Sequence, residues 1–404
     1  MRKISMTNQI MLATILGIFI GVLFGENITE VKIIGDIFLR LIQMPIILLI
    51  MTAVIKAVGN LNPKDLGKLG TKTFSLFLVS SVIAAFFGVG FALWIKPGLN
   101  LNIPIPNETI NSVANSSWSD MLLEFFPTNI VGSMAEGNMI QVILFSILFG
   151  LAISTNKKRE TIQTVVKFID ELNQVIIQLV TLVMKLAPIG IFALMAGVTG
   201  EIGIEVLIPL TKFLLTFGIA SLLFLLLWFI VVSIYTKISV FELVKKSWNV
   251  MLVAFTTTSS AITLPVAMDN AKRNLGISEK VTDLVLPLGL ALNSNGLAMF
   301  LSISSITFSQ IYNVETSFAT IIQSILLCTL ATLGTVVVPG GGLVALTVVV
   351  PALGFPLESV ALLAGIDWFS GMFRTLLNVM GDTSTALVVA KSEGEINYDI
   401  LRAD

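Results

Sequence analysis

Long apolar stretches recur along this chain of 404 residues, and they restrict its fold more than any other feature. A helix needs about 20 apolar residues to cross the hydrocarbon core of a bilayer. Stretches of this kind predict eight transmembrane helices, at residues 8–25, 33–55, 73–95, 139–155, 163–195, 206–235, 281–303 and 359–390. The composition agrees, because 55% of the residues are hydrophobic and only 12% are charged. We therefore expect an all-α polytopic membrane protein.

Residue types that are rare or missing exclude several classes of protein. Histidine is absent, which excludes histidine zinc sites, catalytic triads and histidine proton relays. The single cysteine, Cys328, excludes a disulfide framework and a thiolate metal cluster. Because 24 basic residues nearly balance 25 acidic ones, the composition indicates no basic face and no nucleic-acid partner.

The charged residues between the apolar stretches predict the orientation. Lys and Arg gather on one side of the eight expected spans, and acids on the other, so the positive-inside rule places both termini in the cytoplasm. The N-terminal stretch lacks a small-residue cleavage site, so we interpret it as a first span that stays in the mature protein. The polar residues 98–137 are expected to form a loop outside the membrane. We expect a multi-pass protein of a bacterial inner membrane.

Two apolar segments do not fit the pattern of a simple span. In WNVMLVAFTTTSSAITLPVAM, residues 248–268, the letters TTTSS divide the stretch into short arms, and PGGG does the same between residues 318 and 354. Short apolar arms joined by a polar or glycine-rich tip predict re-entrant hairpins, although one long kinked helix is the alternative for the second segment. The hairpins would enter from opposite faces, a pattern typical of inverted repeats around the binding site of a secondary transporter.

The last apolar stretch contains GMFRTLLNVMGD and carries charged and polar residues at helical spacing. At about 100° per residue, five positions share one stripe, namely Asp367, Gly371, Arg374, Asn378 and Asp382. A charge in mid-bilayer is costly, so it needs a partner or a function. The planar fork of Arg374 suits a carboxylate and Asp367 could hold it, while Asn378 and Asp382 offer hard oxygen ligands for a small cation. The alternative is a structural ion-pair ladder between helices.

Two other polar segments allow two interpretations each. Asn293 to Gly296, in LPLGLALNSNGLAMF, favour either an unwound turn whose carbonyls ligate a cation or a simple kink. The serines and threonines at 256–260 could line an anion-binding nest, or they could only satisfy backbone groups at a hairpin tip.

Together these motifs resemble the dicarboxylate/amino acid:cation symporter family, which includes archaeal aspartate transporters and mammalian glutamate transporters. The resemblance covers nearly the whole chain and rests on RLIQMPIILLI, NMIQVILFSILFGLAI, VMKLAPIGIFALMA, TTSSAITLPVAM, GISEK, LPLGLALNSNG, VPGGG and GIDWFSGMFRTLLNVMGD. It implies a homotrimer in which a mobile transport domain moves like an elevator against a fixed scaffold.

The resemblance also divides the chain. Residues 1–72 would hold the first two helices on the scaffold side, 73–98 the third helix on the transport side, 99–138 the extracellular loop and 139–235 helices four to six. Residues 242–404 would form the transport core, with hairpin 1 at about 242–272, helix 7 at about 280–303, hairpin 2 at about 318–354 and helix 8 at about 357–391.

Carried over by position, the resemblance implies one substrate site and two sodium sites. Arg374 would pair with a substrate carboxylate, with Asp367 in support. The other substrate contacts would be Thr375, Asn378, Thr258, Ser259, Ser260, Val338, Gly342 and the position of Gly371. The first sodium site would use Gly289, Asn293, Asn378 and Asp382, and the second Thr332, Leu333 and Thr335.

Several positions depart from the family pattern. Amino acid carriers have an aspartate for the substrate amino group where this chain has Gly371, and the two other positions where members carry an arginine are Thr258 and Met372. The signature Asn-Met-Asp-Gly-Thr is replaced by Asn293, Ser294, Asn295, Gly296 and Leu297. A third sodium site would have only Phe77, Ser80, Ser81 and Asn295, without a carboxylate.

We therefore predict a secondary active symporter that couples inward cation flux, with Na⁺ as the coupling ion and no organic cofactor, to uptake of a small carboxylate. A dicarboxylate and an acidic or neutral amino acid are both possible substrates, and Gly371 favours a four-carbon dicarboxylate. The alternatives are a proton-coupled exchanger or an anion channel on the same scaffold. An enzyme is not expected, since Asp367 and Asp382 on one helix would be about 22 Å apart, too far to share a proton.

Overall fold

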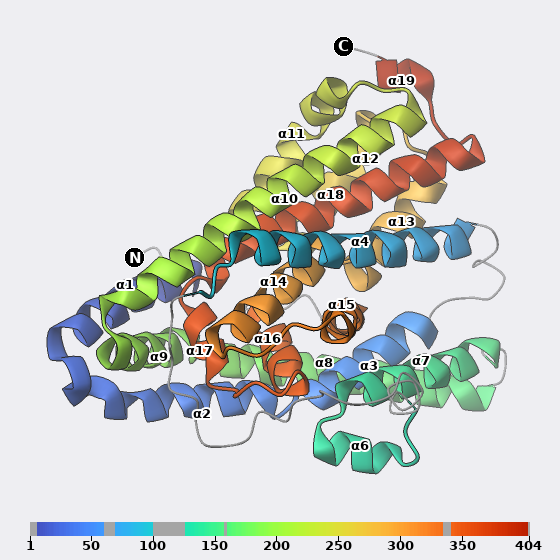
Figure 1. The fold of residues 1–404 in the computed structure, drawn as a ribbon. Coiled ribbons are helices and arrows are strands. Elements are labelled where there is room, and N and C mark those ends of the chain that lie inside the picture. Colours follow the sequence, from blue (N-terminus) through green and yellow to red (C-terminus); the bar gives the residue numbers. More distant parts are fainter. Residues whose placement is uncertain (1–5, 60–68, 100–125, 157–159, 334–340, 403–404) are drawn as a thin grey trace, which may run out of the picture.

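The computed structural model describes residues 6–59, 69–99, 126–156, 160–333 and 341–402, and these are almost entirely helical (Figure 1). Within them the one β-type pairing is an isolated bridge between Ile277 and Ile396. The first half contains α1 Met6–Phe24, η1 Gly25–Val31, α2 Lys32–Gln43, α3 Ile46–Gly59, α4 Thr71–Ile95, α6 Ile130–Glu136, α7 Met139–Thr155, α8 Glu160–Met184, α9 Ala187–Ile202, η3 Ile204–Val206 and α10 Leu207–Thr236. The second half contains α11 Val240–Thr257, α12 Ser260–Arg273, α13 Glu279–Leu292, α14 Asn295–Ile311, α15 Phe318–Leu333, α16 Gly341–Ala352, α17 Ser359–Ala364, α18 Asp367–Glu393 and α19 Tyr398–Arg402. The predicted all-α fold is confirmed.

Several helical runs in the described residues are long and apolar enough to cross a membrane. They are Asn8–Lys56, Thr71–Ile95, Leu207–Thr236 and Glu279–Ile311, together with the pair Ile162–Met184 and Ala187–Ile202, which is bent by 52°. The chain is thus a multi-pass membrane protein by the length and composition of its helices.

Four expected elements differ from the structure. One is the span expected at 359–390, which is divided into α17 and α18 at Gly365 and Ile366. The span expected at 33–55 is divided into α2 and α3 next to Pro45, and the span expected at 163–195 is divided into α8 and α9 next to Pro188. Proline has no backbone N–H and interrupts a helix. The predicted loop at 98–137 contains α6, which starts where the side chain of Asn129 accepts the N–H of Val131.

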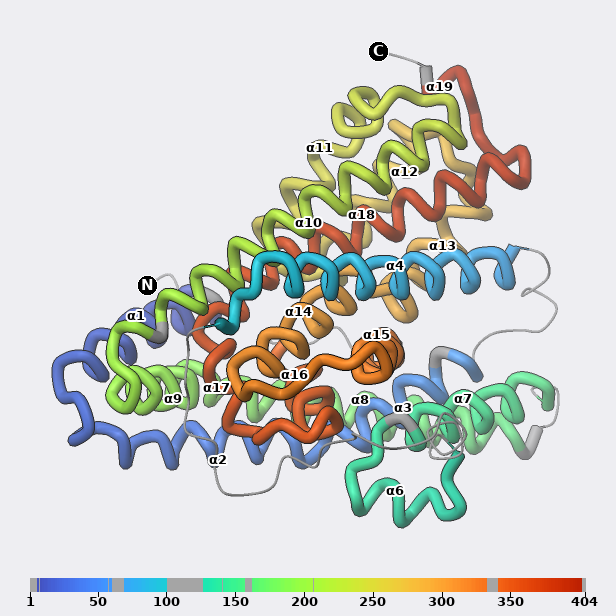
Figure 2. The backbone as a smooth tube through the Cα atoms, viewed as in Figure 1, coloured from blue at the N-terminus to red at the C-terminus, as the bar shows by residue number. Residues whose placement is uncertain are grey.

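The helices pack in two groups (Figures 1 and 2). In the first group α9 packs against α1 and α2, while α3 packs against α7 and α8. In the second group α18 packs against α10, α11, α13 and α14, and α4 packs against α14. Helices α15 and α16 lie between the groups, because α15 contacts α4, α7 and α14, and α16 contacts α2 and α14. They therefore join the two halves of the molecule.

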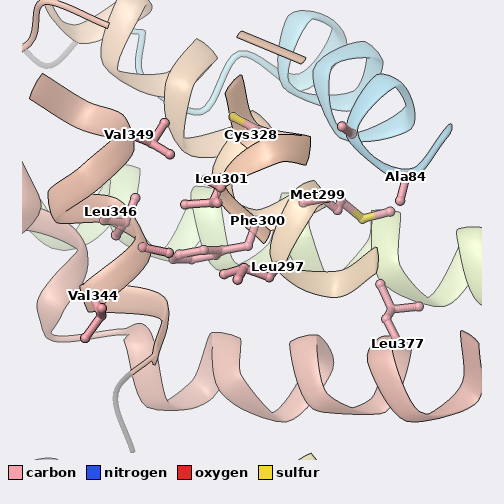
Figure 3. Packing of buried hydrophobic residues seen from close by; sticks show 14 of the residues in the cluster. Ala84, Leu297, Met299, Phe300, Leu301, Cys328, Val344, Leu346, Val349 and Leu377 are labelled. Atoms are coloured by element: carbon pink, nitrogen blue, oxygen red, sulfur yellow. The ribbon is translucent and has the colours of Figure 1, made fainter. Parts of the chain in front are cut away.

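Helix α14 is the buried centre of the second group. All its residues except Gln310 are buried. Phe300 and Leu301 of α14 lie near Leu346 and Val349 of α16 and near Cys328 of α15 (Figure 3). The start of α14 is thereby held in one place by surrounding apolar packing.

Both predicted hairpins are present as pairs of helices. Helix α11 ends at Thr257, its C-cap Thr258 is left-handed at φ 52°, and α12 starts after Ser259. The two helices pack against each other. Helices α15 and α16 also pack together, which excludes one kinked helix. The residues that connect them, 334–340, include Thr335 and Val338 and lie outside the described residues.

Candidate functional site

The polar stripe lies on one continuous helix, as predicted. Helix α18 starts at Asp367 and carries all five stripe residues up to Asp382. Towards its start the stripe meets the first turn of α16, and further along it meets the junction of α13 and α14. The stripe therefore faces hairpin 2 and the break in helix 7 together.

The pair Arg374 and Asp367 lies in the first half of the stripe. Arg374 Nη1 donates to Asp367 Oδ1 at 3.0 Å, and the side chains are only 12% and 9% exposed. The Arg374 guanidinium carbon also lies 5.1 Å from the centre of the Phe300 ring, a cation–π arrangement. Phe213 and Phe217 hold that ring edge-on. Sequence reasoning missed Phe300, because nothing in its apolar surroundings separates it from ordinary core.

Hairpin 2 covers this pair at Gly342. A Cβ atom at Gly342 would overlap Arg374 Nη1 and Asp367 Oδ1, so a larger residue would have to displace this pair. The structure therefore brings Gly342, Arg374 and Asp367 together, as the sequence predicted.

Gly371 and the tip of hairpin 1 lie beside the same guanidinium. A Cβ atom at Gly371 would be 3.5 Å from Arg374 Nη2 and 3.8 Å from Thr258 Cβ, which is ordinary contact. At the tip, Ser259 Oγ accepts the N–H of Ile262 at 3.4 Å.

Much of the hydroxyl chemistry at the hairpin 1 tip serves its own backbone. The hydroxyls of Thr256 and Thr257 donate to carbonyls one turn earlier in α11. The side chains of Thr256, Thr257 and Ser259 thus form hydrogen bonds with backbone groups of their own hairpin. This favours the second interpretation, in which they satisfy the backbone, over an anion-binding nest. Ser260 opens α12, and Thr375 is buried on α18.

The other end of the stripe meets the predicted break in helix 7, which is confirmed. Asn293 and Ser294 have non-helical backbones between α13 and α14. Asn378 Oδ1 accepts the N–H of Gly296 at 2.8 Å, and Asn293 Nδ2 donates to Asp382 Oδ1 at 2.7 Å. A Cβ atom at Gly289 would overlap Asp382. Gly289, Asn293 and Asp382 therefore meet, with Asn378 one turn away on α18.

The polar cluster continues from Asp382 to α4. Ser80 and Ser81 each donate to Asn295 Oδ1 at 3.0 Å, and both hydroxyls lie within 3.4 Å of Asn293 Oδ1. Asp382 is the only carboxylate among these residues, and no group of three or more Cys, Asp or Glu side chains in the described ranges could hold a metal ion. One carboxylate with amide and carbonyl oxygens suits a monovalent cation better than a divalent one.

The predicted second cation site begins at the end of α15. Thr332 is buried near the end of α15, where its hydroxyl donates to the carbonyl of Thr329 at 2.7 Å. Leu333 is the last residue of α15, and Thr335 lies outside the described residues.

Comparison with known proteins gives the chain's relatives. The model of the sodium:dicarboxylate symporter family matches residues 6–392. The chain is 34% identical over 392 residues to the proton/glutamate-aspartate symporter of Bacillus subtilis (strain 168), covering 95% of this chain and 94% of that protein. It is 31% identical to the proton/sodium-glutamate symport protein of Geobacillus stearothermophilus over 99% of this chain and 97% of the relative. It is 30% identical to the C4-dicarboxylate transport protein of Bacillus subtilis (strain 168), over 97% and 94%.

Proposed function

Because the chain belongs to the sodium:dicarboxylate symporter family, whose members are transporters and not enzymes, we propose that it couples inward cation flux to uptake of a C4-dicarboxylate. The observation that carries this proposal is the largely buried Arg374. Among the described residues, Asp367 is its one hydrogen-bond partner, at Nη1. The other guanidinium N–H groups can bind a substrate carboxylate between the two hairpins, since the fork suits two parallel hydrogen bonds.

The choice of a dicarboxylate over an amino acid rests on Gly371. An amino acid bound beside Arg374 would need a nearby carboxylate for its ammonium group. Asp367, however, already pairs with Arg374, and Asp382 already accepts a hydrogen bond from Asn293. Gly371 offers no side chain beside Arg374 Nη2. A second carboxylate on the substrate needs no acidic partner. It can instead accept hydrogen bonds from Arg374 and from the polar groups of Thr258, Ser259, Ser260, Thr375 and Asn378.

We propose Na⁺ as the coupling ion. Its first site would use the carbonyls of Gly289, Asn293 and Asn378 with the carboxylate of Asp382, and its second the backbone of Thr332, Leu333 and Thr335. Coupling by protonation of Asp382 is the competing candidate, since one similar protein is named a proton symporter and Asp382 is the cluster's one carboxylate.

The assembly, orientation and movement of the protein in the membrane form the next part of the proposal. We propose a homotrimer in an inner membrane, with both termini in the cytoplasm and the second helix group moving like an elevator against the first. In support, the two groups meet through few elements, chiefly α15, α16 and α17. A disulfide between introduced cysteines on α2 and α16 should stop uptake reversibly if this movement occurs.

Uptake into proteoliposomes tests the function. Succinate uptake should require an inward Na⁺ gradient, and unlabelled aspartate should compete poorly. Arg374→Ala should abolish uptake, and Arg374→Lys should restore little, since an ammonium lacks the planar fork. If a pH gradient drives succinate uptake without Na⁺, the coupling ion is the proton and not Na⁺. Unchanged succinate uptake by Arg374→Ala would refute the substrate assignment.

A further inference from the structure

A cavity that does not include Arg374 lies beside hairpin 2. It has a volume of about 870 Å³ and is bounded by the α2–α3 corner, the α6–α7 turn, α15 and α16. We call it the seam cavity, because α2 belongs to the first helix group and α16 packs on the second (Figure 1). Its volume lies within the range of small-molecule sites, about 300–1,000 Å³.

Arg40 supplies the cationic group of the seam cavity. This arginine lies within the apolar run Asn8–Lys56, is exposed in the single chain and lines the cavity. Asp36 lies one turn earlier on α2 and interacts electrostatically with Arg40, but within the described residues no ion pair is formed by Arg40. A charged residue in a membrane span needs a partner or a function. The other polar residues that line the seam cavity therefore determine which ligand Arg40 can bind.

The rest of the polar wall suits an anion. Gln43 and Gln323 bring neutral carboxamides from α2 and α15. The one acid of the wall, Glu136, already accepts a hydrogen bond from Asn138 Nδ2 at 2.8 Å. Carboxamide N–H groups and a guanidinium are donors for carboxylate oxygens. We propose that the seam cavity binds a small carboxylate at Arg40, as a second site separate from Arg374.

Helix α16 connects the two sites. Its Gly342 covers the Arg374–Asp367 pair, while Thr347, Val348 and Pro351 line the seam cavity. An anion held between Arg40 and α16 fastens hairpin 2 to α2. High substrate concentrations should therefore slow uptake. The choice of a carboxylate rests on the proposed function, whereas the site itself rests on Arg40.

Binding of succinate to the purified full-length protein tests the proposal, with and without Na⁺. The wild type should show a tight phase and a weak phase. Arg374→Ala should keep only the weak phase, which should not depend on Na⁺ because the cavity shares no residue with the proposed cation sites. Arg40→Gln should keep the tight phase and weaken the weak phase at least about tenfold, as expected for loss of a charged hydrogen-bond partner. The matched control is Arg273→Gln, whose arginine is exposed and pairs with Asp269.

Each outcome decides the question. A weak phase that survives in Arg40→Gln, or that is missing from both wild type and Arg374→Ala, would overturn the proposal. So would retention of phosphatidylglycerol in native mass spectrometry that Arg40→Gln abolishes and succinate does not displace, because the ligand would then be a lipid phosphate. Absence of the tight phase alone would count against the proposed function and leave the Arg40 site standing. In uptake assays, Arg40→Gln should remove the slowing at high succinate concentration, and Arg273→Gln should not.

Discussion

If the proposed function holds, replacement of Gly371 by aspartate should change the substrate preference from a dicarboxylate to an amino acid. The new side chain fits, since its Cβ would stand 3.5 Å from Arg374 Nη2 and 3.8 Å from Thr258 Cβ. Replacing glycine inside a helix also relieves an entropic cost, so Gly371→Asp should fold. The change therefore places one negative charge beside the guanidinium without disturbing the packing.

The expected magnitude follows from the distance between charges. In Gly371→Asp, the new carboxylate and a substrate carboxylate bound at Arg374 Nη2 would both lie beside the same guanidinium nitrogen. With about 5 Å between the two like charges and an effective dielectric constant of about 20, they repel by about 3 kcal/mol. The Kd of succinate should then rise roughly a hundredfold. The Kd of aspartate should change far less or fall, because its ammonium group gains a carboxylate partner.

Competition between labelled succinate and unlabelled aspartate in proteoliposomes measures this change. The matched control is Gly371→Asn, which has nearly the same shape as the aspartate variant and no charge. It should keep succinate binding within about threefold, since it adds no like-charge repulsion. The electrostatic reasoning is wrong if Gly371→Asp leaves succinate affinity unchanged. It is equally wrong if Gly371→Asn damages succinate binding as much.

Three further changes test other parts of the site. Asp382→Asn should abolish cation-dependent uptake, because it removes the one carboxylate of the cluster, and uptake that still follows the Na⁺ gradient would contradict this. Phe300→Leu should lower succinate affinity while Arg374 remains, since the cation–π contact worth about 0.5–2 kcal/mol is lost, whereas Phe300→Tyr should bind normally. Gly296→Ala should destabilise the protein by about 1–3 kcal/mol in thermal unfolding, because the new methyl group would overlap the backbone of Arg374; an unchanged melting temperature would refute that overlap.

Much of the fold could be predicted because its signals are local. Apolar length indicated the spans, and the polar tips indicated both hairpins. Helical spacing placed Asp367 and Arg374 on one face, where they form an ion pair. The break at Asn293 was visible because asparagine and glycine interrupt an apolar helix. Each of these signals depends on neighbours in the sequence.

The remaining features depend on which distant segments meet. The close approach of Gly342 to Arg374 and Asp367 involves α16 and α18, so the PGGG letters alone could not identify these partners. Phe300 looks like any core residue until Arg374 is placed over its ring. Arg40 belongs to the motif RLIQMPIILLI, which supported only the resemblance to the family. The cavity that Arg40 lines forms only where α2 packs against α16. Long-range packing of this kind leaves no local pattern.

The charges of the site make a last prediction about coupling. Arg374 and Asp367 cancel, so an ionised Asp382, as proposed for the Na⁺ site, gives the empty site one negative charge. Asn295 adds none, although it lies in the same cluster with Ser80 and Ser81. A dicarboxylate with two Na⁺ ions is neutral, so the loaded and empty sites would carry the same net charge. Buried charge is costly in a membrane, and this balance leaves that cost unchanged when the substrate binds. A full cycle with these charges moves no net charge across the membrane, so the steady-state accumulation of succinate should not depend on a membrane potential set by potassium and valinomycin. Greater accumulation at an inside-negative potential would show that a third cation moves with the substrate.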